Sequence, residues 1–195
     1  MFRTSVKNYN VFFRFLLIFS STLVFLAFLI LGHKLVLKTI LYPLPYKETI
    51  FNYSREYGLN NALIYAVIKT ESNFKPKAVS EKGAKGLMQI TDKTGEYISR
   101  MKKIKTYDLF DEQTNIEFGC YYLAYLIKSF DSEELAVIAY NAGEGNVRSW
   151  LANPKYSDDN KNLKYIPFPE TREYVKKVKK TFEKYKKLYV HILDK

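Results

Sequence analysis

The sequence predicts an all-α protein, in which one N-terminal transmembrane helix precedes a helical domain. Three observations support this fold class. An uncharged apolar run lies near the N-terminus, apolar residues recur at spacings of three and four over most of the remaining chain, and no sustained two-residue alternation is present. The first observation predicts a membrane span, the second amphipathic helices, and the third argues against a sheet.

The composition excludes several classes of protein. With 195 residues and 47% hydrophobic side chains, the chain can build a core, so disorder throughout is excluded. A single cysteine excludes an internal disulfide framework and a cysteine-built zinc site. The two histidines, His33 and His191, lie far apart in the sequence, so we expect no metal site.

The net charge of +11 is unevenly distributed. The first 47 residues carry six basic and no acidic side chains, and the segment from residue 172 onward carries nine basic and three acidic ones. The intervening segment has 16 basic and 17 acidic residues and is therefore nearly neutral. A nucleic-acid binder concentrates positive charge on its recognition module, so we expect no nucleic-acid partner.

The apolar run extends from Phe15 to Leu31 and is interrupted only by small hydroxyl residues. Together with residues 11–13 it is long enough to span a bilayer as a helix, and Arg14 can snorkel to the interface. A cleaved signal peptide is the main alternative, but the run is long and no A-x-A-like site follows it. A buried core helix is a weaker alternative for an all-round apolar segment. We expect a short basic cytoplasmic segment (1–14), a transmembrane signal anchor (15–33), a spacer (34–46) and one domain (47–195).

Helical periodicity continues through the predicted domain. Gly58 is a suitable C-cap for a first helix, and Asn60 or Asn61 a suitable N-cap for a second, which ends before Pro76. A long helix with an apolar stripe is expected near the C-terminus. The predicted helices are residues 46–57, 61–72, 112–130, 132–140 and 171–193.

Glu71 continues the apolar face of the second of these helices. Leu63, Ile64, Val67 and Ile68 share that face by the three-and-four rule. Burial and the negative end of the helix dipole both raise the proton affinity of a carboxyl there, as a general acid requires. The plain structural alternative is a surface glutamate paired with a nearby lysine at position 69 or 75.

Two glycine-rich segments follow. Residues 83–90, GAKGLMQI, form a loop in which Gln89 offers an amide suited to a sugar hydroxyl or acetamido group. Residues 139–146, AYNAGEGN, end a helix in a glycine-rich turn and present Tyr140 and Asn141. The alternative is an ordinary helical turn with a tyrosine in the core.

In chain order, ES-x-F-x-P, GAKGLMQI, AYNAGEGNV and IPFPETREYVKKV resemble the motifs of the soluble lytic transglycosylase (SLT) catalytic domain, a lysozyme-like family. The resemblance covers roughly residues 46–187. It implies that Glu71 is the single catalytic acid/base. The implied substrate-binding residues are Ser80, Gln89, Tyr140, Asn141 and Glu170, with Ser80 at the muramyl acetamido group. Thr91 departs from the family, in which methionine often follows MQI.

The resemblance also implies an activity. Lytic transglycosylases cleave the β-1,4 bond between N-acetylmuramic acid and N-acetylglucosamine in peptidoglycan without water and leave 1,6-anhydromuramyl ends, and they need no metal or cofactor. Neither Asp92 nor Glu96 matches a second catalytic carboxylate. Two alternatives remain: a hydrolytic, lysozyme-type muramidase, and a non-catalytic wall-binding module of a secretion or conjugation machine.

Peptidoglycan lies outside the cytoplasmic membrane, so the resemblance implies a single-pass protein with its domain on the cell-wall side. The expected partners are glycan strands and, through the N-terminal helix, the membrane. The sequence does not indicate which proteins, if any, bind this chain. The basic C-terminal helix most simply presents a solvated face, and attraction to anionic wall polymers or lipid head groups is the alternative. Cys120 is expected to be a small core residue.

Overall fold

The computed structural model describes residues 3–193, with side chains from residue 13 onward, and divides into two compact units, Met1–Leu44 and Pro45–Lys195. In the first unit, helix α1 (Arg3–Val36) continues into the π-helical turn η1 (Leu37–Leu41). The stretch Phe13–Leu41 is long and apolar enough to cross a membrane, and its apolar side chains are not buried by protein. Helical structure therefore extends beyond residue 33, into the expected spacer.

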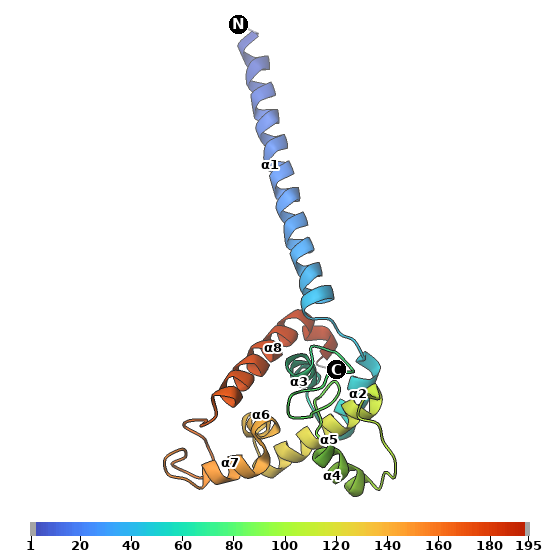
Figure 1. Ribbon diagram of the computed structural model, residues 1–195. Helices are drawn as coiled ribbons and strands as arrows, with labels where there is room; N and C mark the ends of the chain where they lie inside the picture. Colours follow the sequence, from blue (N-terminus) through green and yellow to red (C-terminus); the bar gives the residue numbers. More distant parts are fainter. Residues whose placement is uncertain (1–2, 194–195) are drawn as a thin grey trace. The chain divides into compact units, whose positions relative to one another are not determined.

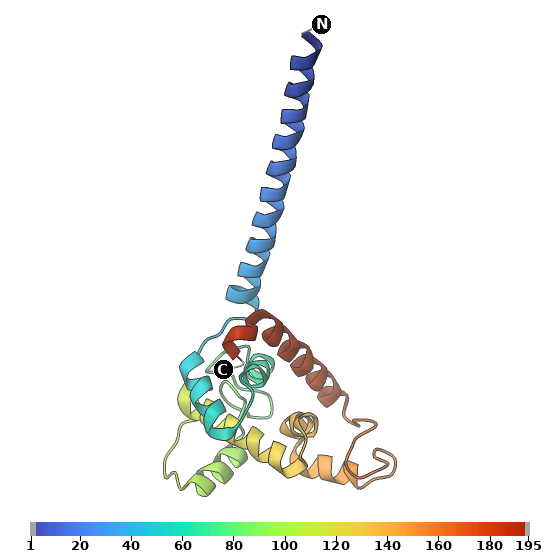
Figure 2. The same ribbon diagram turned by 180° about the vertical axis from the view of Figure 1, so that it is seen from behind.

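The second unit is built from helices joined by loops (Figures 1 and 2). Within residues 45–193 the only β-type pairings are isolated bridges from Lys85 to Val79 and to Ile90, which confirms the all-α prediction. Its helices are α2 (Lys47–Tyr57), α3 (Asn61–Glu71), α4 (Asp92–Lys102), α5 (Glu112–Phe130), α6 (Glu133–Ala142), α7 (Glu144–Leu151) and α8 (Pro169–Leu193).

The predicted helix ends agree closely with the observed ones. Gly58 ends α2 in the left-handed conformation (φ 67°), and the side chain of Asn60 caps α3 by accepting from the backbone N–H of Ala62. Helices α4 and α7 were not predicted. Each contains a glycine and few apolar residues, which weakens the helical signal. The apolar residues that are present do recur at helical spacing, as Val147, Trp150 and Leu151 of α7 show.

Helix α3 is the central helix of this unit. Residues 62–68 are all buried, and α3 packs mainly against α8, with further contacts to α2. Both views show α3 near the middle of the second unit with α8 along one edge (Figures 1 and 2). Burying each of these aliphatic side chains contributes roughly 1.5–3 kcal/mol, which fixes α3 firmly. Cys120 is fully buried in α5, as expected of a core residue.

Candidate active site

Glu71 is the last residue of α3, where the rigid central helix meets a long loop. Its side chain is partly buried and forms no ion pair within residues 13–193. The neighbouring Ser72 donates to the carbonyl of Leu87 over 2.8 Å, so the end of α3 is fastened to the loop that returns beside it. Pairing of Glu71 with Lys69 or Lys75, the plain structural alternative, is not observed.

Desolvation raises the pKa of Glu71 from 4.5 to about 7. The buried Tyr174 hydroxyl of α8 lies near this carboxyl, without a close hydrogen bond to any group in the described part of the chain, and its interaction opposes part of the shift. The Tyr140 hydroxyl also faces the carboxyl, and burial beside this negative charge raises the pKa of both tyrosines well above 10. No cation within residues 13–193 forms an ion pair that would stabilise the ionised form of Glu71. At neutral pH a substantial fraction of Glu71 therefore holds a proton.

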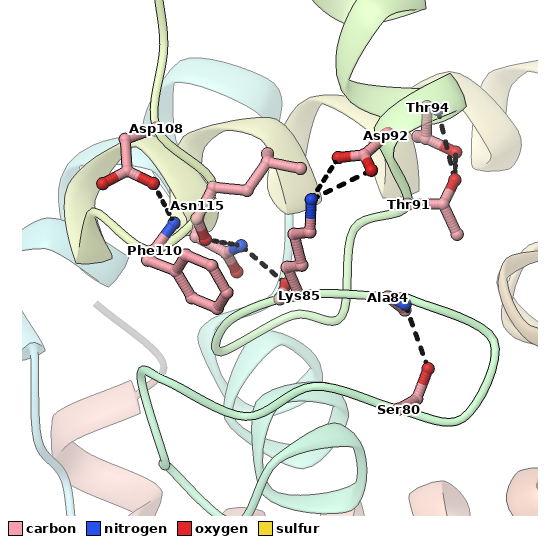
Figure 3. Close-up of polar contacts among 10 residues, drawn as sticks. Ser80, Ala84, Lys85, Thr91, Asp92, Thr94, Asp108, Phe110 and Asn115 are labelled. Atoms are coloured by element: carbon pink, nitrogen blue, oxygen red, sulfur yellow. Dashed lines mark hydrogen bonds and ion pairs between the residues drawn. The ribbon is translucent and has the colours of Figure 1, made fainter.

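The loop that faces Glu71 is held in place by Asn115 of α5, which is almost completely buried. Its side-chain oxygen accepts from the N–H of Met88 over 2.7 Å, and its amide nitrogen donates to the carbonyl of Leu109. The same nitrogen donates to the carbonyl of Lys85 (Figure 3). Gly86 has a φ of 77°, and a Cβ there would lie 2.3 Å from the Asn115 amide nitrogen. The glycine is therefore required both for this backbone conformation and for the close approach of loop and helix.

The same loop connects to Tyr140. The Tyr140 hydroxyl donates to the carbonyl of Met88 over 2.9 Å. The peptide groups on the two sides of Met88 are thus held by Asn115 and by Tyr140. Met88 itself is fully buried, as expected of a core residue, and Gly119 leaves space for its side chain, since a Cβ there would lie 2.2 Å from the sulfur. This arrangement fixes the loop relative to α5 and α6, with Tyr140 beside the Glu71 carboxyl.

Ser80 and Glu170 lie at the edge of the site. The Ser80 hydroxyl accepts from the N–H of Ala84 over 3.0 Å and stabilises a tight turn (Figure 3). Lys82, within this turn, forms an ion pair with Glu170 over 2.9 Å, and both side chains are exposed. This exposed pair joins the turn to the first turn of α8 and is worth little in stability.

Gln89, Tyr140 and Asn141 line a single pocket of about 260 Å³, together with Thr91 and Tyr122. Gln89 has a left-handed backbone (φ 51°), which is unusual for a non-glycine residue and is supported by hydrogen bonds from its amide nitrogen to the carbonyls of Gly86 and Ala78. Thr91 also caps α4. Glu71, Ser80 and Glu170 do not line this pocket; Glu71 is linked to it by the electrostatic interaction with Tyr140.

The hydrogen bonds within the site determine what each side chain can still offer a ligand. The amide hydrogens of Gln89 are engaged by backbone carbonyls, which leaves its oxygen as an acceptor. The oxygen of Asn141 accepts from Thr171 over 2.8 Å, which leaves its amide as a donor. Because Ser80 accepts from Ala84, its own O–H remains a donor. The site thus offers both donors and acceptors, as an acetamido group and sugar hydroxyls require.

A second pocket of about 430 Å³ shares Thr94, Tyr122 and Gly143 with the first. Tyrosine rings follow one another from Tyr140 along this surface: Tyr140 to Tyr122 with centroids 5.6 Å apart, Tyr122 to Tyr125 at 6.2 Å, and Tyr125 to Tyr97 at 5.8 Å. Sugar rings stack readily on such aromatic faces.

Sequence reasoning missed several parts of this site. Tyr174 lies on the apolar stripe of the predicted C-terminal helix, and its spacing does not show that its hydroxyl lies near Glu71. Asn115 was not singled out, although a polar residue on the buried side of a helix is a usable signal. The tyrosine row was missed because Tyr97 and Tyr122 belong to different helices.

Comparison with known proteins shows the family to which this chain belongs. The model of the transglycosylase SLT domain matches residues 48–163. The chain belongs to this family. It is 38% identical over 143 residues to the soluble lytic murein transglycosylase of Salmonella typhimurium, covering 70% of this chain and 22% of that protein. It is 32% identical over 169 residues to the membrane-bound lytic murein transglycosylase C of Edwardsiella ictaluri, covering 73% of this chain and 47% of the relative.

A solved structure supports the membership in the SLT family. The 70 kDa soluble lytic transglycosylase of Escherichia coli aligns with a TM-score of 0.66 and 34% identity, over 75% of this chain and 25% of that chain. A complex of the 70 kDa enzyme with bulgecin A gives the same agreement. The family resemblance and the lysozyme-like fold expected from the motifs are thus confirmed. The chain spans only about a fifth of the length of its soluble relatives.

Proposed function

We propose that this protein is a membrane-anchored peptidoglycan lytic transglycosylase with Glu71 as its only catalytic acid/base. The observation that carries the proposal is the environment of Glu71. Its carboxyl lies at the end of a rigid buried helix, has a pKa raised to about 7 by desolvation, interacts with the hydroxyls of Tyr174 and Tyr140, and forms no ion pair within residues 13–193. This environment suits a group that must donate and then accept a proton near neutral pH.

In the first step, protonated Glu71 donates its proton to the glycosidic oxygen between N-acetylmuramic acid and N-acetylglucosamine. The C1–O bond breaks, N-acetylglucosamine leaves with a 4-hydroxyl, and the acetamido group of the muramyl residue stabilises the positive anomeric carbon. Ser80, with its free O–H donor, is the residue we assign to this acetamido group. Gln89, Tyr140, Asn141 and Glu170 are assigned to binding the glycan.

In the second step, ionised Glu71 removes the proton of the muramyl 6-hydroxyl, and that oxygen bonds to C1. The product is a 1,6-anhydromuramyl end, and Glu71 regains its proton without consuming water. A two-carboxylate mechanism would require a partner facing Glu71. The nearby candidates are otherwise placed: Asp92 pairs with Lys85, Glu144 pairs with Arg148, and Glu96 is exposed.

We further propose that the apolar helix within Phe13–Leu41 anchors the protein in the cytoplasmic membrane from residue 15 onward, with residues 1–14 in the cytoplasm and the catalytic unit on the cell-wall side. The exposed apolar surface of this helix supports anchoring, because no protein in the structure covers it. The location of peptidoglycan outside the membrane supports the orientation.

Mass spectrometry of fragments released from purified peptidoglycan tests the activity. The full chain in detergent should release anhydromuramyl ends, each one water lighter than a hydrolysed end, and Glu71→Gln should release them at least roughly 10²-fold more slowly. Reducing muramyl ends would favour the hydrolytic muramidase. If the folded protein released no fragments, the non-catalytic wall-binding module would replace this proposal.

A further inference from the structure

The solvent-facing side of α8 carries a strip of positive charge that the proposed reaction does not use. Lys180, Lys184 and Lys187 recur at i, i+4 and i+7 and therefore lie along one side of the helix. All three are exposed, and none forms an ion pair within residues 13–193. They line a shallow depression of about 560 Å³ together with Lys186, Val190 and a single acidic residue, Glu183. We call these six residues the lysine surface.

Val190 gives the lysine surface an apolar element. Its side chain is 49% exposed, although it sits among lysines near the end of an otherwise well-buried apolar stripe. An exposed aliphatic group beside lysines can contact the outer part of the acyl region while the lysines contact anionic head groups. A purely solvated face needs no such group.

The start of the catalytic unit is connected to the buried face of α8 through Tyr65 of α3. The buried Tyr65 of α3 donates from its hydroxyl to the carbonyl of Pro45 over 3.2 Å. The Tyr65 ring stacks on Tyr185 of α8 with centroids 5.2 Å apart, and Tyr185 lies between Lys184 and Lys186 in the sequence. The chain therefore enters this unit at the level of the helical turns that carry the lysines, one side chain away from the buried face of α8.

Only a short connector joins the apolar helix to this entry point, and its length limits how far the catalytic unit can lie from the membrane. Leu41 ends the apolar helix, and Pro45 is four residues further along. Four extended residues reach at most about 14 Å, so a membrane-inserted helix keeps Pro45 near the bilayer surface whatever the arrangement of the two units. A tether of this length lets the lysine surface approach the lipid head groups to within the Debye length, which is about 8 Å at physiological ionic strength.

We infer that the lysine surface binds the anionic head groups of the membrane in which the protein is anchored. This inference rests on the proposed anchoring. The contact would form a second attachment beside the tether and would limit the orientations of the catalytic unit above the membrane. A charged wall polymer is the competing occupant, but the nearby chain entry point favours the membrane.

Fluorescence energy transfer from a labelled residue of the full chain to a labelled lipid measures this contact. Because Cys120 is buried, His191→Cys introduces one accessible thiol, which is labelled with a donor fluorophore. The protein is inserted in vesicles that contain an acceptor-labelled lipid, made from phosphatidylcholine alone or with phosphatidylglycerol. A donor placed instead by Met101→Cys on α4, away from α8 in both views, is the positional control (Figures 1 and 2).

Energy transfer from position 191 should rise when phosphatidylglycerol is present, and it should fall again when NaCl is raised to about 1 M, where the Debye length is about 3 Å. Changing Lys180, Lys184 and Lys187 to glutamine should lower the docked-to-undocked ratio roughly fivefold for each lysine. The matched control, with the exposed Lys105, Lys128 and Lys161 changed to glutamine, should retain the increase.

Flotation with neutral vesicles separates the two proposals. A chain that fails to float contradicts the anchoring itself. A chain that floats but shows the same transfer from position 191 in both lipid mixtures overturns the inference and leaves the anchoring intact. Lysine-dependent binding of soluble poly(glycerol phosphate) without a lipid effect would assign the surface to wall polymers and would also overturn it.

Discussion

Two partly buried glutamates in this domain, Glu117 and Glu71, have different partners at their carboxyl groups. Glu117 of α5 forms an ion pair with Lys102 and accepts from the hydroxyl of Tyr53, and the Lys102 side chain is only 19% exposed. Glu71 has tyrosine hydroxyls nearby and no cation, and its pKa rises to about 7. Two carboxyls in similar aromatic surroundings are thus suited to different tasks: Glu117 to holding α4 and α5 together, Glu71 to exchanging a proton.

Replacing each glutamate by glutamine gives the largest contrast. Glu71→Gln should lower the rate of glycan cleavage by roughly 10²- to 10⁴-fold, the usual contribution of a general acid, because an amide cannot donate the required proton. Glu117→Gln should leave the rate of the folded fraction within a factor of two to three (our estimate for a residue outside the site, about 0.5 kcal/mol). The rate of soluble fragment release per folded molecule measures both. Equal losses in the two variants would refute the distinction.

Stability should respond to removal of a cation from the structural pair. Lys102→Met leaves the Glu117 charge partly buried without its partner, which we expect to lower the free energy of unfolding by about 1–3 kcal/mol. Urea denaturation at neutral pH measures the change. The control is Lys105→Met, which alters an exposed lysine of the same region and should change stability by less than about 0.5 kcal/mol. Equal effects would show that the Lys102–Glu117 pair is dispensable.

Removing the Glu71 carboxyl should instead raise the free energy of unfolding, and only at pH values above the ordinary pKa of a glutamate. Between pH 4.5 and about 7 the folded protein retains a proton that the unfolded chain has lost, so the free energy of unfolding falls as pH rises through this window. Glu71→Gln removes the ionisable group and therefore this pH-dependent fall in the free energy of unfolding. The variant should exceed the wild type by up to about 3 kcal/mol at pH 8, with no such pH-linked gain below pH 4. A gain that did not change with pH would contradict the raised pKa.

The smallest predicted effect concerns Tyr174. Its interaction lowers the pKa of Glu71, so Tyr174→Phe should raise that pKa further. The alkaline limb of the activity profile should then move to higher pH by less than about one unit. Val178→Ala, on the same face of α8, controls for loosened packing and should lower stability without moving the limb. A shift to lower pH in Tyr174→Phe would contradict the assigned role of its hydroxyl.

Much of the fold could be predicted from the sequence, because strong signals were local. Gly58 and Asn60 mark helix ends by chain chemistry alone, and the face shared by Val67 and Glu71 follows from helix geometry. Helix α7 was missed although Val147, Trp150 and Leu151 recur at helical spacing. The segment is short and contains a glycine, and contacts such as that of Trp150 with Phe168 contribute to its stability.

For the candidate site, the sequence indicates candidate residues but not their geometry. The motifs identified Glu71 and Gln89, but no pattern indicates that the amide hydrogens of Gln89 are engaged by backbone carbonyls. The position of Met88 between Asn115 and Tyr140 likewise depends on three separate segments meeting in space. Such long-range hydrogen bonds depend on the packing of helices and leave no periodic trace in the sequence.

The central claim is that Glu71 holds its proton near neutral pH, and a direct titration tests it. The full chain, with ¹³C at the side-chain carboxyls of its glutamates, is followed by NMR across the pH range, and Glu71→Gln identifies the signal that belongs to residue 71. We predict a midpoint at about pH 7 for this signal. A midpoint near 4.5, the ordinary value, would contradict the account, because Glu71 would then be ionised when it must act as an acid.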